Sequence, residues 1–127
     1  MSKYVLDASA LLALLDAEPG ADKVAAVLAN AVIGTVNLAE VHTKLAERGH
    51  SARQALARIL SVMEAVVSFT EVHAAITGSL RASTMHLGLS LGDRACLALG
   101  IALDAEVYTA ERVWAQVQPP CVIYLIR

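Results

Sequence analysis

The chain has 127 residues, a formal net charge of −2 and an apolar fraction of 57%. This length suits one domain with its own hydrophobic core, so we expect residues 1–127 to form a single domain. The near-neutral charge argues against a strongly basic surface for nucleic acid, but it is compatible with a local basic patch. The cysteines, Cys96 and Cys121, show no metal-type pairing and no disulfide framework. We expect both to be small buried hydrophobic residues in a reduced compartment.

The N-terminal stretch MSKYVLDASALLALLDAEPGA superficially resembles a signal peptide, because one lysine precedes an apolar run. However, Asp7 interrupts this run, and Asp16 and Glu18 follow closely. No segment reaches the ~20 apolar residues that a membrane span requires. The sequence therefore predicts a cytoplasmic protein without a membrane segment.

Short β-rich runs alternate with longer segments of helical periodicity along the chain. In chain order, the predicted elements are strand Tyr4–Leu6, helix Ala8–Leu15, helix Ala21–Leu28, strand Ala31–Ile33, helix Val36–Arg48, helix Ser51–Met63, strand Ala65–Ser68, helix Glu71–Ser83, helix Ser90–Leu103, strand Val107–Tyr108, helix Glu111–Val117 and strand Val122–Ile126. Such alternation is typical of an α/β protein with helices on both faces of a mainly parallel sheet. The predicted fold class is therefore a three-layer α/β/α sandwich, which places functional residues at the carboxyl ends of its strands.

Four acidic residues lie at junctions between predicted strands and helices or near helix starts. They are Asp7 at the end of YVLD, Glu40 just over one turn into the helix opened by GTVNLAEV, Asp93 in the first turn after LSLG, and Glu111 in VYTAERVW. Because the carboxyl ends of parallel strands share one edge of a sheet, these carboxylates are expected to converge. Taken singly, each acid has a structural explanation as a helix cap, a helix-dipole residue or, for Glu40, an i,i+4 partner of Lys44.

Converging carboxylates repel one another and need a compensating cation to remain ionised together. Ligands that are all oxygen atoms favour a hard ion, Mg²⁺ or Mn²⁺, over zinc. Such an ion lowers the pKa of water and stabilises charge on a phosphate during in-line displacement. The acid pattern therefore indicates metal-dependent phosphodiester hydrolysis, without being unique to it.

Two other enzyme classes have weaker support. The stretch GLSLGD at residues 88–93 matches the G-x-S-x-G pattern of serine hydrolases, but STMHLGL before it is a weak strand and no histidine follows Ser90. The S-x-x-D pattern predicts instead that Ser90 caps a helix with Asp93 in its first turn. A haloacid-dehalogenase-type phosphatase would need an aspartate at Ser9, and no G-x-x-x-x-G-K-[ST] loop is present. None of the four histidines is assigned to catalysis; they are His42, His50, His73 and His86.

Four segments, YVLDASALLALL, TVNLAEV, LSLGDRACLALG and VYTAERVW, carry a family resemblance over nearly the whole chain. In order and separation they resemble the PIN-domain nucleases and, among them, the small VapC-like toxins of bacterial toxin–antitoxin pairs. The resemblance implies a five-stranded parallel sheet between helices and an endoribonuclease activity that depends on Mg²⁺ or Mn²⁺. It assigns the metal to Asp7, Glu40 and Asp93.

The same resemblance implies supporting roles for Ser9 and for Thr109, which matches the residue before the last acidic position of the family. That last position is commonly aspartate, whereas this chain has Glu111. Glu111 is therefore a candidate catalytic residue whose contact with the metal, and with it the number of ions, stays open.

Positive charge near the acids is needed for contact with RNA, and Arg94 and Arg112 each adjoin a predicted ligand. Further basic residues follow the Glu40 motif, namely Lys44, Arg48, Arg53 and Arg58. The resemblance also implies a homodimer and a cognate antitoxin protein, which would bind the apolar surface of the first helices; its leucines Leu11, Leu12, Leu14 and Leu15 have core packing as their other explanation. Two functional alternatives remain, a degenerate PIN fold that binds without catalysis and an RNA-processing nuclease that is not a toxin.

Overall fold

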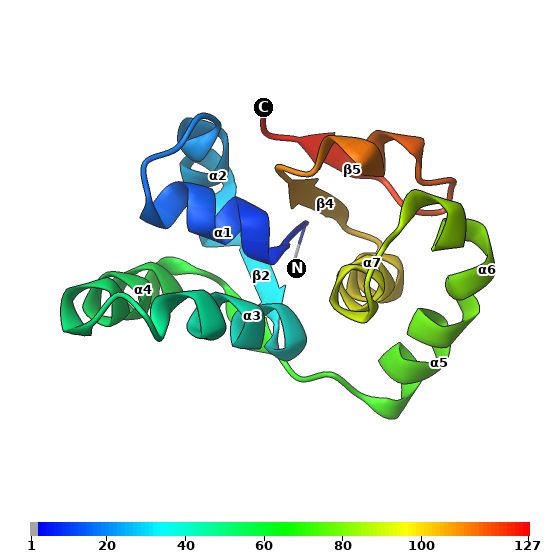
Figure 1. The fold of residues 1–127 in the computed structure, drawn as a ribbon, viewed down its shortest axis with the longest axis horizontal. Coiled ribbons are helices and arrows are strands. Elements are labelled where there is room, and N and C mark those ends of the chain that lie inside the picture. The colour runs from blue at the N-terminus through cyan, green and yellow to red at the C-terminus, as the bar shows by residue number, and fades with distance from the viewer. Residues whose placement is uncertain (1–2) are drawn as a thin grey trace.

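A computed structural model of the chain describes residues 3–127 and contains one five-stranded sheet with the strand order β3-β2-β1-β4-β5 (Figure 1). The strands are β1 (Tyr4–Leu6), β2 (Ala31–Gly34), β3 (Ala65–Val67), β4 (Glu106–Thr109) and β5 (Ile123–Leu125). All four neighbouring pairs of strands are parallel. The chain builds β1, β2 and β3 outward in one direction and then returns to place β4 and β5 on the other side of β1. The predicted parallel sheet of about five strands is confirmed.

Helices cover both faces of this sheet. Within the described residues they are α1 (Ala8–Leu15), α2 (Ala21–Val27), α3 (Thr35–Leu45), α4 (His50–Val62), α5 (Glu71–Ser79), α6 (Arg81–Thr84) and α7 (Leu91–Leu103), with the 3₁₀ helices η1 (Leu28–Asn30), η2 (Met85–Leu87) and η3 (Arg112–Gln116). Helices α1 to α4 lie on one side of the sheet and α5 to α7 on the other (Figure 1). The three-layer α/β/α prediction is therefore confirmed. None of these helices is both long and apolar enough to cross a membrane.

The central strand β1 is buried on both faces. Leu6 belongs to the hydrophobic core shared with α1 to α4, whereas its neighbour Val5 belongs to the core shared with α7. Both side chains have no exposed surface. A strand in this position needs apolar side chains at successive residues, which is why the short run YVL was recognisable as a strand.

The prediction of one continuous helix at Glu71–Ser83 is wrong. The segment forms two helices, α5 and α6, that meet at Leu80. Near the end of α5, the carbonyl oxygen of Thr77 accepts a hydrogen bond of 3.0 Å from Arg94 Nη1 of α7. This tertiary bond satisfies a carbonyl close to the helix end, and no local sequence pattern predicts it. The predicted helix Glu111–Val117 is likewise a 3₁₀ helix, η3, with Glu111 as its N-cap residue.

The two cysteines differ in their surroundings. Cys96 is fully buried as expected, but Cys121 is only partly buried, and neither forms a disulfide. Burial raises the pKa of both thiols above the ordinary range of cysteine. Both are therefore protonated and poorly reactive at neutral pH.

The close packing of α7 on β4 depends on Gly100. A Cβ atom at this position would lie 2.5 Å from Val107 Cγ2, well inside van der Waals contact. We expect Gly100→Ala to reduce the free energy of unfolding by about 1–3 kcal/mol, because overpacking outweighs the better helix propensity of alanine. Gly78→Ala in α5 is the matched control, since its Cβ would have no neighbour within 4 Å, and it should add about 0.5–1 kcal/mol. Urea unfolding measures both changes, and shifts of the same sign would contradict the packing argument.

Candidate active site

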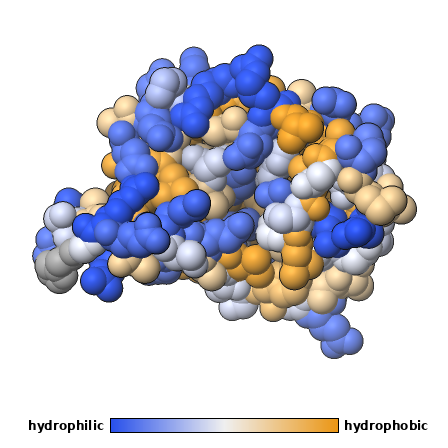
Figure 2. Space-filling model, viewed as in Figure 1, coloured by the Kyte–Doolittle hydropathy of each residue, from blue (hydrophilic) through white to orange (hydrophobic). Residues whose placement is uncertain are grey.

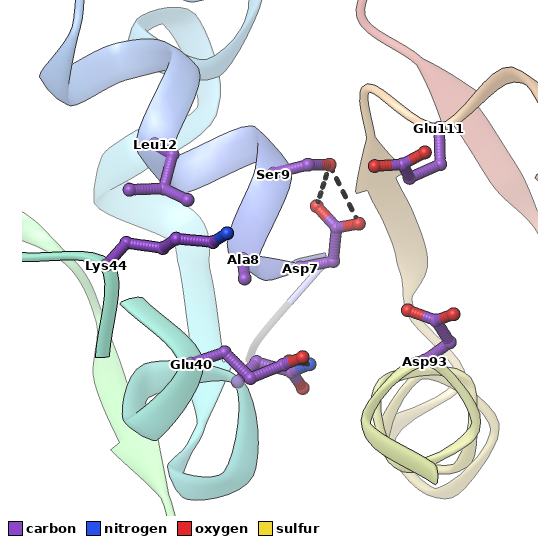
Figure 3. Close-up of a pocket in the computed structure, with 9 residues that line it drawn as sticks. Asp7, Ala8, Ser9, Leu12, Glu40, Lys44, Asp93 and Glu111 are labelled. Atoms are coloured by element: carbon purple, nitrogen blue, oxygen red, sulfur yellow. Dashed lines mark hydrogen bonds between the residues drawn. The ribbon is translucent and has the colours of Figure 1, made fainter. Parts of the chain in front are cut away.

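A pocket lies at the carboxyl edge of the sheet, beside the point where the strand order reverses between β1 and β4. Segments that follow these two strands leave in different directions, which opens a crevice at such a position in parallel sheets. The pocket has a volume of about 190 Å³ and is lined by Asp7, Ala8, Ser9, Leu12, Asn37, Glu40, Lys44, Asp93 and Glu111 (Figure 3). The molecular surface is hollowed near the middle of this face, with polar residues inside and hydrophobic areas on either side (Figure 2).

The structure brings all four predicted acids to this pocket, although they come from four separate segments. Asp7 follows β1, Glu40 lies in α3, Asp93 lies in the first turn of α7, and Glu111 follows β4. Their carboxylates face a common space (Figure 3). The four acids therefore converge as expected, while Asp7 also caps α1 and Asp93 also belongs to the capping box of α7.

Asp7 is the most buried of the four acids, with 4% of its surface exposed. It is the N-cap residue of α1, and its Oδ1 accepts a hydrogen bond of 2.8 Å from the backbone N–H of Ala10. The hydroxyl of Ser9 donates to the same carboxylate, with Oγ 2.7 Å from Oδ1 and 2.9 Å from Oδ2. Thr109 Oγ1 donates to Oδ2 over 2.6 Å, so β4 contributes directly to the position of Asp7.

The two hydroxyl groups at Asp7 are themselves oriented by the backbone after β4. Ser9 Oγ accepts a hydrogen bond of 2.9 Å from the N–H of Ala110, and Thr109 Oγ1 accepts one of 3.0 Å from the N–H of Glu111. Because each hydroxyl receives an N–H on its lone pairs, its own hydrogen points to the Asp7 carboxylate. Ser9 and Thr109, expected from the sequence to support the site, therefore lock the Asp7 side chain in one orientation.

Burial raises the pKa of Asp7 from 3.8 to about 6. The hydrogen bonds from Thr109, Ala10 and Ser9 oppose this rise, whereas the nearby charge of Glu111 adds to it. The desolvation of the carboxylate thus outweighs the donors around it. A cation in the pocket would favour the ionised form of Asp7, so the buried carboxylate favours binding of a positive charge beside it.

Thr109→Val should raise the pKa of Asp7 further, because the substitution removes a hydrogen bond that stabilises the ionised carboxylate. The shift can be measured by NMR titration of the ¹³C-labelled carboxyl group in the presence of EDTA. Thr43→Val serves as the control, since the exposed Thr43 hydroxyl donates only to the carbonyl of Ala39. An unchanged or lower pKa in Thr109→Val would contradict this view of the site.

Glu40 is held in place by Asn37, a residue that the sequence analysis missed. Asn37 Nδ2 donates to Glu40 Oε1 over 2.7 Å and to the carbonyl oxygen of Gly92 over 3.1 Å, so it connects α3 with α7. Only 2% of Asn37 is exposed. Its partners are both acceptors, which fixes the orientation of the amide. The i,i+3 spacing of Asn37 and Glu40 places them on one helix face and was the signal that would have found it.

Asp93 has a structural role as well as a place in the pocket. Ser90 Oγ accepts a hydrogen bond of 3.1 Å from the N–H of Asp93, and Asp93 Oδ2 accepts one of 2.9 Å from the N–H of Ser90. This capping box confirms the prediction that Ser90 begins α7. In the described chain no strand lies between β3 and β4, so Ser90 lacks the strand that a nucleophile elbow requires.

The residues of the pocket suit a hard divalent ion in their chemistry, since their ligand atoms are carboxylate and amide oxygens. Within residues 3–127, however, no three histidine, cysteine, aspartate or glutamate side chains are placed to hold one ion directly. The carboxylates surround the space and do not meet at one point (Figure 3). An ion here would keep several water molecules, as Mg²⁺ usually does in proteins.

The two predicted phosphate contacts, Arg94 and Arg112, do not line the pocket. Arg94 is 9% exposed and donates to the carbonyl of Thr77, and its Nε has no hydrogen-bond partner. Arg112 is exposed and donates to the carbonyl oxygen of Arg127. The expectation that these side chains lie beside the acids they adjoin in sequence is not met, and their contact with RNA phosphate stays a prediction. The described histidine side chains, those of His42, His73 and His86, also lie outside the pocket lining.

Comparisons with known proteins agree with this fold. A family model described as the PIN domain matches residues 4–118. Comparison with curated protein sequences gave no match. Among solved structures, the chain is similar to VapBC2 from Rickettsia felis bound to promoter DNA, with a TM-score of 0.79, 18% identity and coverage of 95% of this chain and 96% of that chain.

Two further structures show the same similarity. DNA-bound VapBC from Salmonella typhimurium gives a TM-score of 0.75 at 19% identity and covers 100% of both chains. VapBC-5 from Mycobacterium tuberculosis gives a TM-score of 0.65 at 21% identity and covers 100% of this chain and 99% of that chain. At such low identity, these similarities establish the fold.

Proposed function

Since the chain belongs to the PIN domain family, we propose that it is an endoribonuclease that hydrolyses RNA phosphodiester bonds with the help of Mg²⁺ or Mn²⁺. One observation carries this proposal, namely the four carboxylates from separate segments that line a single pocket. The family model ends at residue 118, but β5 at Ile123–Leu125 completes the same sheet. This continuity supports the view that residues 1–127 form one PIN-like nuclease domain.

Asp7, Glu40 and Asp93 are the residues proposed to hold the ion. When bound, the ion would lower the pKa of water and neutralise charge that develops on the phosphate. Each of the three carboxylates is fixed in advance by neighbouring groups in the structure: Asp7 by two hydroxyls, Glu40 by Asn37, and Asp93 by the capping box. Such preorganisation reduces the reorganisation needed during the reaction.

Glu111 is proposed to orient the attacking water and to accept its proton. Its carboxylate faces the pocket and, in the part of the chain that the structure describes, accepts no hydrogen bond (Figure 3). A carboxylate without protein partners is free to accept a proton from water. The longer side chain of glutamate, compared with the aspartate common in the family, reaches into the pocket from the segment after β4.

We further propose that the protein is a cytoplasmic toxin of a toxin–antitoxin pair that forms a homodimer and is inhibited by a cognate antitoxin. The similar Rickettsia and Salmonella structures are VapBC complexes bound to DNA, and the Mycobacterium tuberculosis structure is of a member of the VapBC family of toxin–antitoxin systems. The leucines of α1 divide between core and surface: Leu11 is buried, whereas Leu14 and Leu15 line a second hollow of about 380 Å³ beside Ile59 and Val62 of α4. This apolar hollow supports binding of an antitoxin segment.

The decisive experiment measures cleavage of RNA by the purified protein with Mg²⁺, with Mn²⁺ and with EDTA. We expect cleavage with either ion, none with EDTA, and loss of cleavage in Asp93→Asn. Asp104→Asn is a matched control, because Asp104 is exposed outside the pocket at φ +52°, a conformation that asparagine tolerates.

Two outcomes would contradict the proposal. Cleavage that persists in Asp93→Asn would place the activity in another site or another protein. RNA binding without any metal-dependent cleavage would instead indicate a PIN fold that acts as a binding module. A small DNA-binding protein encoded in the neighbouring reading frame would favour the toxin over a general RNA-processing nuclease.

A further inference from the structure

The pocket has an unbalanced charge for a site that is to bind an anionic substrate. Four carboxylates line it, and Lys44 is its single basic lining residue among residues 3–127. One divalent ion would offset only part of this negative charge, so a phosphodiester group would still be repelled by the remainder. A fixed positive charge at the pocket would lower that repulsion.

Lys44 is well placed to supply this charge. It lies in the last turn of α3 and shares a helix face with Asn37 and Glu40, at i,i+3 and i,i+7 spacing from Asn37. Its amine extends toward Ala8 and Asp7, across the pocket from Asp93 and Glu111 (Figure 3). The ammonium group of Lys44 therefore lies across the pocket from the carboxylates of Asp93 and Glu111.

Lys44 forms no ion pair with any other described residue. The sequence suggested an i,i+4 pair with Glu40, but the ion pairs of the described chain are Arg48–Asp16 and Arg127–Glu18. The Glu40 carboxylate is bound by Asn37 instead, over 2.7 Å. The Lys44 ammonium is consequently available for a ligand in the pocket.

None of the other basic residues considered from the sequence lines the pocket, and three of them bind other groups. Arg94 is buried against Thr77, and Arg112 binds the C-terminal residue Arg127. Arg48 is paired with Asp16. Of the basic residues considered from the sequence, Lys44 is therefore the one that lines the pocket.

We propose that Lys44 binds the non-bridging oxygens of an RNA phosphodiester group at the pocket. The inference rests on the proposed function and names the residue that holds its substrate. A volume of about 190 Å³ is below the 300–1,000 Å³ typical of pockets that enclose a whole organic ligand, so it suits a phosphate with an ion and water but not a nucleobase. Lys44 thus binds the backbone of RNA and contributes affinity without reading the sequence.

The test compares Lys44→Ala and Lys44→Arg with the unaltered protein in cleavage of a single-stranded RNA oligonucleotide. Lys44→Ala should raise KM by roughly tenfold, change kcat little, and reduce the slope of log KM against log salt concentration by about one. Lys44→Arg should restore most of the affinity because it keeps the positive charge. Lys23→Ala, at an exposed residue of α2 outside the pocket, is the matched control and should behave like the unaltered protein.

Metal titration separates substrate binding from a structural role of Lys44. The concentration of Mg²⁺ that gives half-maximal activity should stay the same or fall in Lys44→Ala, since removal of a cation does not weaken the binding of another cation nearby. An unchanged KM and salt slope in Lys44→Ala would overturn the inference while cleavage by the unaltered protein upheld the proposed function. A protein that cleaves no RNA with either ion would contradict the proposed function itself.

Discussion

Asp7→Asn is expected to make the metal-free protein more stable at pH 8 while it reduces RNA cleavage on the order of 10³-fold. The stability effect follows from the pKa of Asp7, which is about 6 in the folded protein and 3.8 when the side chain is in water. The folded state therefore binds the proton more tightly than the unfolded state. The stabilisation from this group is complete below about pH 4 and is lost as the pH rises through about 6.

The size of the effect can be estimated from the same shift. A shift of about two pKa units corresponds to about 3 kcal/mol. This energy is not reduced for solvent screening, because the carboxylate of Asp7 is almost completely buried. Asparagine avoids this cost at pH 8, but its amide group replaces the oxygen that accepts from Thr109, at a cost of about 1 kcal/mol. A net gain of about 1–2 kcal/mol is therefore expected for Asp7→Asn at pH 8.

Urea unfolding in EDTA at pH 4, 6 and 8 measures this prediction, with Asp104→Asn as the control for the aspartate-to-asparagine exchange. The advantage of Asp7→Asn should grow from pH 4 to pH 8, and added Mg²⁺ should stabilise the unaltered protein more than the variant. A constant loss of stability in Asp7→Asn at every pH would show that its hydrogen bonds outweigh the cost of burying its charge.

Gly92→Ala is expected to reduce kcat by about 10- to 100-fold without loss of stability, by analogy with the loss of other groups that orient ligands. A Cβ at this position would lie 2.8 Å from Glu40 Oε2 and 2.9 Å from Glu40 Cδ. These atoms form the end of a flexible side chain, so the Glu40 carboxylate would move and the backbone would not. The movement would break the bond of 2.7 Å with Asn37 that orients Glu40.

Stability should be maintained because Gly92 lies in the first turn of α7 and is not among the glycines with positive φ. Alanine is the better helix former by up to about 1 kcal/mol. Gly78→Ala, the same exchange at an uncrowded position of another helix, should leave kcat unchanged. If Gly92→Ala acts only through Glu40, it should add nothing to the loss caused by Glu40→Ala, and a further decrease in the double variant would reject this explanation.

The position of the acids could be predicted from the sequence because a parallel sheet converts order along the chain into position in space. Asp7 and Glu111 follow strands, and Asp93 lies at the start of a helix. The fact that the carboxyl ends of parallel strands share one edge of the sheet was therefore sufficient to predict that these residues lie close together. Glu40 needed one more piece of information, the length of helix between it and β2. The roles of these residues as metal ligands and catalytic groups stay predictions.

The direction of neighbouring side chains could not be predicted in the same way. Successive residues of an α-helix point about 100° apart, so Arg94 faces α5 while Asp93 faces the pocket. The same rotation explains why Lys44, four residues after Glu40, reaches the pocket. Hydrogen bonds between helices, such as that from Asn37 to Gly92, depend on how α3 packs against α7. No local sequence pattern predicts them.

The hydroxyl groups of Ser9 and Thr109 connect the Asp7 carboxylate to the backbone after β4 by hydrogen bonds. The amides of Ala110 and Glu111 each end a two-bond relay that begins at a single carboxylate. A change of charge on that carboxylate changes the strength of the hydrogen bonds from its two hydroxyl donors. The hydrogen bonds from the two peptide N–H groups to these hydroxyls change as a result. The backbone ¹H–¹⁵N chemical shifts of these two residues are therefore expected to change when an ion binds in the pocket.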